Sequence, residues 1–168
     1  SEETLQIINS KLTSARVFLR EADVLMLTLG TSWVYVSKET GKVVSNCHKM
    51  PASNFIRERL HVEDIVADLS ETFKLLEQSN PGVKIILTVS PIRHWKDGVH
   101  ENTVSKSTLH LAVNMLCNQM TNISYFPAYE IMMDELRDYR FYASDMLHPS
   151  EVAIDYIWKR FSDSFFSE

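Results

Sequence analysis

The stretch VKIILTVSP, residues 83–91, decides the fold class. It is a short apolar run that ends at a proline, and such runs are typical of strands buried on both faces of a sheet. A similar run, ADVLMLTLG, ends at Gly30, and a third strand is predicted in ISYFPAY, residues 123–129. Helical patterns separate these runs, and this alternation predicts an α/β protein with a parallel sheet.

Helices are predicted where apolar residues recur at three- and four-residue spacing. These segments are residues 5–19, 62–76, 103–120 and 149–165, with a short helix at EIMMDEL. The segment VYVSKETGKVV predicts a hairpin that turns at KETG. Three main strands are few for an α/β fold, so the sheet is expected to be incomplete, with its N-terminal strands missing.

Composition limits the classes of function. The 168 residues suit a single domain, residues 1–168, and the formal net charge of −5 disfavours binding to nucleic acids or anionic membranes. No apolar run approaches the roughly 20 residues of a membrane span. Two cysteines, Cys47 and Cys117, cannot build a disulfide framework and fit a reducing compartment, so a cytoplasmic location is expected. No phosphate-binding glycine motif occurs, and no cofactor is expected.

Polar residues follow the predicted strands at the edge where open parallel sheets bind ligands. The first strand is followed by Gly30, Thr31 and Ser32. A glycine permits close backbone approach, and its N–H can contribute to an oxyanion hole, with Thr31 or Ser32 as a further donor. The alternative interpretation is a turn glycine before a hairpin.

The second strand is followed by Ser90, Arg93 and His94. Arg93 can hold a carboxylate or polarise a carbonyl. His94 and His100 suggest a metal site, but no cysteine or carboxylate stands at a recognised spacing, so no metal is expected. The alternative is an exposed loop in which Trp95 packs on the sheet edge.

The segment SDMLHPS, residues 144–150, places Asp145 three positions before His148. On a tight turn the carboxylate can accept the imidazole Nδ1–H, which frees Nε2 to activate a serine or cysteine. The alternative is that Asp145 caps a turn and His148 merely precedes a proline. Cys47 beside His48 is a weak catalytic pair, because adjacent side chains in an extended segment point to opposite faces.

Four stretches together resemble the GSCFA family of bacterial proteins, which is grouped with the SGNH (GDSL-like) hydrolases. They are LTLGTSWVY, NCHKMP, SPIRHWKDGVHENTVSK and YFPAYEIMMDELRDYRFYASDMLHPS. The resemblance extends from the first predicted helix to the last. It implies a flavodoxin-like three-layer α/β/α sandwich and activity as an esterase, deacetylase or other acyl-ester hydrolase, or as an acyltransferase.

The resemblance also implies roles for single residues. The D-x-x-H motif of SGNH enzymes matches Asp145 and His148, and Gly30 stands where their oxyanion-hole glycine is expected. Ser32 replaces the expected asparagine; its hydroxyl can donate one hydrogen bond but is shorter. The Gly-Ser-Cys-Phe-Ala signature is absent from the sequence. The chain is therefore expected to be the C-terminal part of a longer protein, with a serine or cysteine nucleophile outside it.

These observations predict an enzyme that acts on a small-molecule or carbohydrate acyl ester, with His148 as general base and Asp145 orienting it. The alternative is a non-catalytic module of the same fold that binds a glycan or acylated ligand. A further expectation is self-association, because an incomplete sheet exposes a strand edge.

Overall fold

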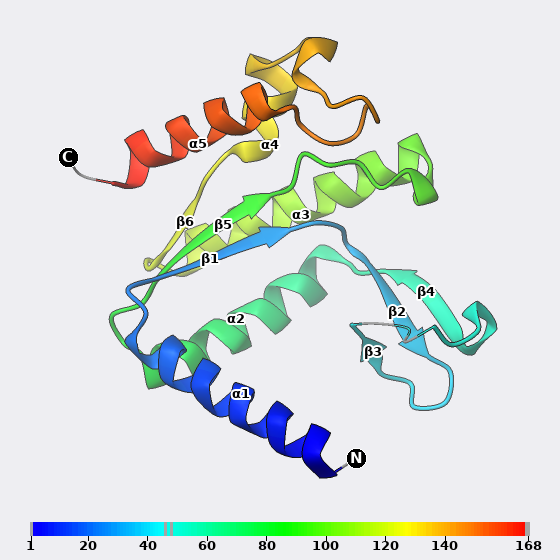
Figure 1. Ribbon diagram of the computed structural model, residues 1–168, viewed down its shortest axis with the longest axis vertical. Coiled ribbons are helices and arrows are strands. Elements are labelled where there is room, and N and C mark those ends of the chain that lie inside the picture. The colour runs from blue at the N-terminus through cyan, green and yellow to red at the C-terminus, as the bar shows by residue number, and fades with distance from the viewer. Residues whose placement is uncertain (1, 46, 48, 167–168) are drawn as a thin grey trace.

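A parallel sheet forms the centre of the chain (Figure 1). The computed structural model describes residues 2–45, 47 and 49–166. The strands are β1 (Val24–Leu29), β5 (Lys84–Val89) and β6 (Ile123–Tyr125), in the order β1-β5-β6. Leu29 pairs with Val89 and Leu87 with Tyr125, so all three strands run towards the same edge. The predicted α/β class and parallel sheet are confirmed.

The middle strand, β5, is covered on both faces, which explains its continuous apolar sequence. On one face Ile85, Leu87 and Val89 pack against α2 (Val62–Ser79) and α3 (Val99–Gln119). All three side chains are fully buried. Burial of this apolar surface is the main force that holds these helices to the sheet.

The second face of the sheet carries the C-terminal elements. These are α4 (Ala128–Glu130), the π-helical turn η3 (Ile131–Glu135), the 3-10 turn η4 (Tyr139–Phe141) and α5 (Glu151–Phe165). Ile86 of β5 packs in this layer with Phe126 and Phe161, whose ring centroids lie 5.1 Å apart. The sheet therefore has helices on both faces, as in an α/β sandwich.

A small antiparallel sheet lies beyond the carboxyl end of β1 (Figure 1). Its strands are β2 (Trp33–Ser37), β3 (Val43–Val44) and β4 (Phe55–Arg59), in the order β3-β2-β4, and the 3-10 turn η1 (Ala52–Asn54) precedes β4. The predicted hairpin is confirmed as β2 and β3. Strand β4 was not predicted, because its five residues mix apolar and charged side chains and its partner β2 is distant in sequence.

Contacts between the small sheet and the loop after β5 hold that loop in place. The loop contains the 3-10 turn η2 (Trp95–Asp97). Arg57 of β4 forms an ion pair with Asp97, and its guanidinium carbon lies 5.0 Å from the centroid of the Trp33 ring. A buried ion pair with cation–π support restrains the loop, which carries several of the candidate site residues.

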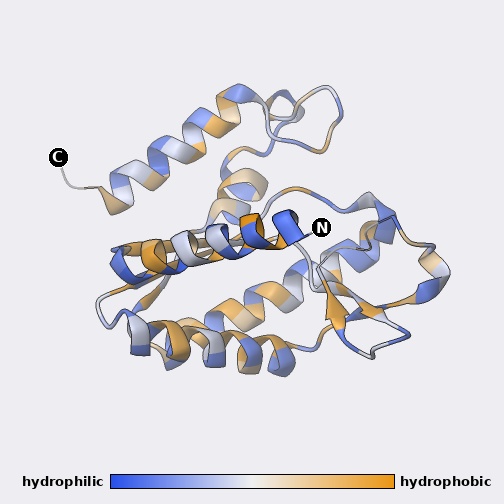
Figure 2. Cartoon of the chain, turned by 60° about the horizontal axis from the view of Figure 1, so that its bottom comes forward, coloured by the Kyte–Doolittle hydropathy of each residue, from blue (hydrophilic) through white to orange (hydrophobic). Residues whose placement is uncertain are grey.

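The N-terminal helix α1 (Glu2–Glu21) buries none of its residues, although apolar positions recur along it (Figure 2). Its C-terminal end is held by Asn80, whose Nδ2 donates to the carbonyl oxygens of Leu19 and Ala22. On β1 the side chains of Val24 and Met26 are exposed. The expected self-association stays a prediction. None of the described helices has the length and apolar character needed to span a bilayer.

Candidate active site

The structure brings Asp145 and His148 into direct contact. Asp145 Oδ2 lies 2.5 Å from His148 Nδ1, and Asp145 Oδ1 accepts hydrogen bonds of 2.9 Å from the backbone N–H groups of Leu147 and His148. The His148 side chain is 59% exposed, so the ring is open to a ligand. Asp145 therefore acts both as a turn cap and as the partner of His148, which unites the two interpretations of SDMLHPS.

The turn that presents this pair is closed by backbone hydrogen bonds. Ala143 N–H donates to the His148 carbonyl at 2.8 Å, and Tyr142 pairs with Pro149 in an antiparallel bridge. Met146, at the tip, adopts a positive φ of 61°, which is rare and strained for a residue with a long side chain. Ser150 then caps α5 by accepting from the Ala153 N–H. The turn thus fixes the Asp145–His148 pair between a bridge and a helix.

The charge of Asp145 is stabilised by its surroundings. The backbone N–H groups of His148 and Leu147, followed by the His148 side chain, lower the pKa of Asp145 to about 2. A carboxylate that accepts several hydrogen bonds holds its charge far into the acid range. Asp145 is therefore an anion at any physiological pH, and it is suited to stabilise an imidazolium at His148.

Three buried polar side chains of α3 hold the segments that follow β1 and β5. We call them the polar triad: Asn102, Ser105 and Lys106, exposed by 6%, 1% and 1%. Their spacing places all three on one helix face. Leu109, Val113 and Leu116 continue that face into the core. The face therefore changes from apolar to polar at the edge of the sheet where a ligand is expected.

Ser105 organises the segment after β1. Its Oγ accepts from the Ser32 N–H at 2.8 Å and from the Ser32 hydroxyl at 3.1 Å. With both lone pairs used, Ser105 donates its own hydrogen to Thr31 Oγ1 at 3.1 Å. Thr31 Oγ1 also accepts from the Trp33 N–H, so the Thr31 hydroxyl hydrogen is left for a ligand. Both Ser32 donors are committed to Ser105, and the donors that can serve a ligand are those of Gly30 and Thr31.

Lys106 joins the ends of the two strands. Its Nζ donates to the carbonyl oxygens of Gly30 and Ser90, each at 2.6 Å. Burial lowers the pKa of the Lys106 ammonium to about 8. Ser90 contributes its carbonyl to this arrangement, and its hydroxyl oxygen accepts from the Ile92 N–H at 3.2 Å. A positive charge therefore lies beneath the Gly30 segment at neutral pH.

Asn102 positions His94. The Asn102 Oδ1 accepts from the His94 N–H at 2.9 Å, and a Cβ placed on Gly30 would lie 3.7 Å from His94 Nε2. The imidazole thus lies beside Gly30. Partial burial, and then the charge of Lys106, lower the pKa of His94 below its usual value and so favour the neutral ring.

Arg93 connects the loop after β5 to the turn that bears His148. Its guanidinium carbon lies 5.9 Å from the Tyr142 ring centroid, and its Nη2 lies 3.6 Å from Met133 Sδ. In Figure 1 that turn and that loop lie on the same side of the sheet, beyond the end of β5. Within the residues that the structure describes, no hydrogen bond joins the Asp145–His148 pair to Gly30. The pair and the Gly30 segment are therefore two separate groups near the same edge of the sheet.

The sequence interpretation missed the polar triad. A signal was present, because Asn102, Ser105 and Lys106 occupy positions that continue the buried face of a helix, where polar side chains are uncommon. Their partners could not be read from the sequence. Ser105 and Lys106 contact residues 73 to 76 positions away in the chain.

Substituting Ser105→Ala is expected to lower the free energy of unfolding by about 1–3 kcal/mol. The change leaves the buried N–H and hydroxyl of Ser32 without a partner, and such groups carry their full desolvation cost. Urea denaturation measures the effect. Ser107→Ala is the matched control, because Ser107 is exposed on the same helix, and its change should stay within about 0.5 kcal/mol. Equal effects of the two substitutions would contradict this role of Ser105.

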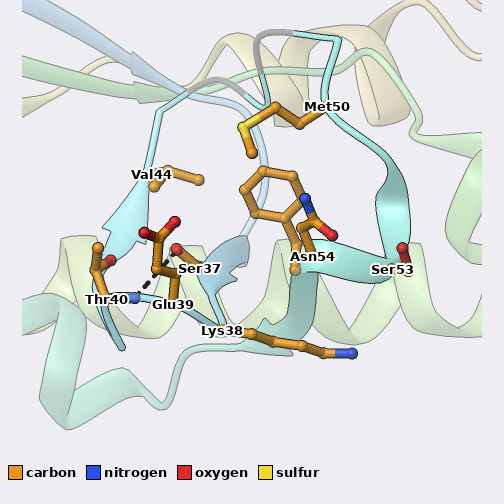
Figure 3. Close-up of a pocket in the computed structure, with 9 residues that line it drawn as sticks. Ser37, Lys38, Glu39, Thr40, Val44, Met50, Ser53 and Asn54 are labelled. Carbon is orange, nitrogen blue, oxygen red and sulfur yellow. Dashed lines mark hydrogen bonds between the residues drawn. The ribbon is translucent and has the colours of Figure 1, made fainter.

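A cavity of about 530 Å³ lies in the small sheet and is lined by none of these residues (Figure 3). In Figure 3 Met50 and Val44 point towards the cavity, and Lys38 extends away from it. The Ser37 hydroxyl accepts from the Thr40 N–H, so it serves the hairpin turn. The described lining contains no histidine or cysteine that could act with the Asp145–His148 pair.

Two histidines, His94 and His100, were considered as metal ligands. His94 lies beside Gly30, and His100 lies in the first turn of α3. Over residues 2–45, 47 and 49–166, no three His, Cys, Asp or Glu side chains form a group suited to a metal ion. His48, considered with Cys47, lies outside the described residues.

The sequence was compared with models of known protein families and with curated proteins. The model of the GSCFA family matches residues 1–161. A comparison with curated proteins finds no match.

Proposed function

The chain belongs to the GSCFA family, and from this premise we propose that its site serves acyl transfer, as an SGNH-like acyl-ester hydrolase or acyltransferase. The contact of 2.5 Å between Asp145 Oδ2 and His148 Nδ1 carries the proposal. It gives His148 the tautomer and the neighbouring negative charge that a general base needs.

In the proposed mechanism, His148 Nε2 accepts the proton of a serine or cysteine as that group attacks the acyl carbon. The resulting imidazolium is stabilised by Asp145 and returns the proton to the leaving alcohol. Water or another alcohol then attacks the acyl-enzyme by the same route in reverse. The Gly30 N–H and the Thr31 hydroxyl are proposed donors to the oxyanion, supported by the charge of Lys106.

The nucleophile is proposed to come from outside these residues. Within the described part of the chain, the Nε2 atom of His148 contacts no hydroxyl or thiol at hydrogen-bond distance. Cys117, the cysteine on α3, is half-buried and packs beside the core of α2, α3 and β5. Burial raises the pKa of its thiol, which disfavours the reactive thiolate.

Labelling of the gene product, expressed from its own coding sequence, tests the function. Fluorophosphonate labels an activated serine and iodoacetamide an activated cysteine. We expect one of them to react in a manner that His148→Ala reduces at least about 100-fold. His100→Ala, at an exposed histidine, is the matched control. The 168-residue chain alone should not turn over p-nitrophenyl acetate; rapid turnover abolished by His148→Ala would place the nucleophile within it.

A non-catalytic binding module is the second candidate. It is favoured by the open Nε2 of His148 and by the use of both Ser32 donors within the protein. In that case a folded gene product would react with neither reagent.

A reducing, cytoplasmic location is also proposed. Both Cys47 and Cys117 are free thiols, which is usual where glutathione keeps thiols reduced. Fractionation of the source cells tests it, and recovery of the protein in a secreted fraction would contradict it.

A further inference from the structure

A cavity of about 270 Å³ lies against the turn that carries His148. Its lining includes Arg93 from the loop after β5, Arg137 and Tyr139 from the segment after η3, and Tyr142 from the turn itself. Tyr142 pairs with Pro149, the residue after His148. A ligand in this cavity would therefore contact the residue that pairs with the end of the turn bearing Asp145 and His148.

The cavity has an excess of positive charge. Arg93 contacts a tyrosine ring and a thioether sulfur, neither of which is an anion. Among the described residues, no carboxylate forms an ion pair with Arg93 or Arg137. The lining contains one carboxylate, that of Asp138. Asp138 accepts hydrogen bonds of 2.9 Å from the backbone N–H and the guanidinium of Arg140, so this carboxylate already has a cationic partner outside the lining.

Arg93 and Arg137 differ from the other arginines without an ion pair in that they line one cavity together. The guanidinium group is a planar fork of donors that fits a carboxylate or a phosphate. The Tyr142 ring fixes Arg93 from one side and lowers the entropy that Arg93 would lose on binding. The Tyr139 side chain, 77% exposed, offers an apolar face beside the arginines.

We propose that Arg93 and Arg137 form a subsite for an anionic group, a carboxylate or a phosphate, on the substrate whose acyl ester is presented to His148. This inference rests on the proposed function, because it assigns the subsite to the same substrate. It deepens that function by restricting the substrate class to anionic acyl esters and by assigning Arg137, which the sequence did not single out.

Two anionic probes and one neutral probe test the subsite. Propionate, propionamide and inorganic phosphate are titrated into the isotopically labelled gene product at constant ionic strength. The arginine Nε–Hε signals and the backbone amides of residues 137–143 are followed by NMR. We expect saturable shifts with propionate and with phosphate, and the tighter ligand identifies the anionic group. Propionamide, which has the size of propionate without its charge, should give no saturable shift.

Single substitutions assign the effect. Arg93→Gln and Arg137→Gln should each weaken anion binding about tenfold or more, because each removes charge-assisted hydrogen bonds. Arg137 is exposed, so its variant is expected to fold even if the Arg93 variant does not. Arg16→Gln on α1 is the matched control, since it changes the net charge equally at an exposed site distant in sequence, and binding should be unchanged.

The two proposals fail in distinguishable ways. The subsite would be overturned by equal responses to propionate and propionamide. It would also be overturned if both arginine substitutions left anion binding unchanged, which would indicate adventitious ion binding only. These titrations need no turnover. Absence of reactivity towards both labelling reagents, with charge-dependent binding intact, would overturn the acyl-transfer proposal and leave an anion-binding site at Arg93 and Arg137.

Discussion

His148→Ala is expected to lower kcat of the gene product by about 10³-fold or more on any ester that it turns over. The substitution removes the group that takes the proton from the nucleophile and returns it to the leaving alcohol, and such groups contribute about 10²–10⁴-fold. The backbone of the turn should remain, because the Asp145 Oδ1 hydrogen bonds come from N–H groups that alanine retains. KM should change little, so the loss belongs to the chemical step.

Asp145→Asn separates orientation from structure at the same site. The asparagine Oδ1 can still accept from the N–H groups of Leu147 and His148, which keeps the turn. Its NH₂ would face His148 Nδ1 and donate to it, which places the imidazole hydrogen on Nε2 and blocks proton transfer. We expect a fall in kcat of at least about 10²-fold in a chain that still folds. Asp155→Asn on α5 is the matched control, and equal kinetics of the two variants would contradict a role in catalysis.

The pH dependence of the pair follows from the pKa of Asp145. Because the folded pKa of about 2 lies below the ordinary value of 3.8, the stabilisation from Asp145 is present above pH 4 and is lost as the pH falls towards 2. A loss of activity between pH 5 and 7 therefore cannot come from Asp145. Urea denaturation at pH 5 and pH 2.5 should show a smaller loss of stability in Asp145→Asn than in the parent chain, because the variant lacks this carboxylate. Equal losses in the two chains would contradict the lowered pKa of Asp145.

The elements predicted correctly from the sequence are those with local causes. The run at residues 83–91 was predictable because its unbroken apolar sequence is the local signal of a strand covered on both faces, as β5 is. Asp145 and His148 are three residues apart, so their contact was one of the possibilities that the spacing alone suggested. The hairpin of β2 and β3 is likewise local, because the residues that favour its turn lie between the two strands.

What could not be predicted depends on contacts between distant segments. Strand β4 forms by pairing with β2, and its mixed sequence has no strong period of its own. Helix α3 begins at Val99, before the expected position, because Gly98 adopts a φ of 79° that lets the chain turn into the helix. The position of Ser32 in the sequence motif suggested a donor to the oxyanion. The fold shows that both the N–H and the hydroxyl of Ser32 donate to Ser105.

Substituting Lys106→Met is expected to lower the free energy of unfolding by about 2 kcal/mol at pH 7. The methionine fills a similar volume but leaves the carbonyl oxygens of Gly30 and Ser90 without their donor, and hydrogen bonds from charged groups contribute about 1.5–3 kcal/mol each. The cost of burying an ammonium offsets part of this loss, which is why the net value is smaller than the sum. Lys11→Met, on exposed α1, is the matched control.

The sign of the pH effect distinguishes a buried ammonium from a simple packing role. The pKa of Lys106 is about 8 in the folded chain and 10.5 ordinarily, so between these values the unfolded chain binds more protons. Stability from this group therefore rises as the pH increases through 8 and is lost as the pH falls. Urea denaturation at pH 7 and 9.5 should show this rise in the parent chain and in Lys11→Met. It should be absent in Lys106→Met; the same rise in all three would show that Lys106 is not the group responsible.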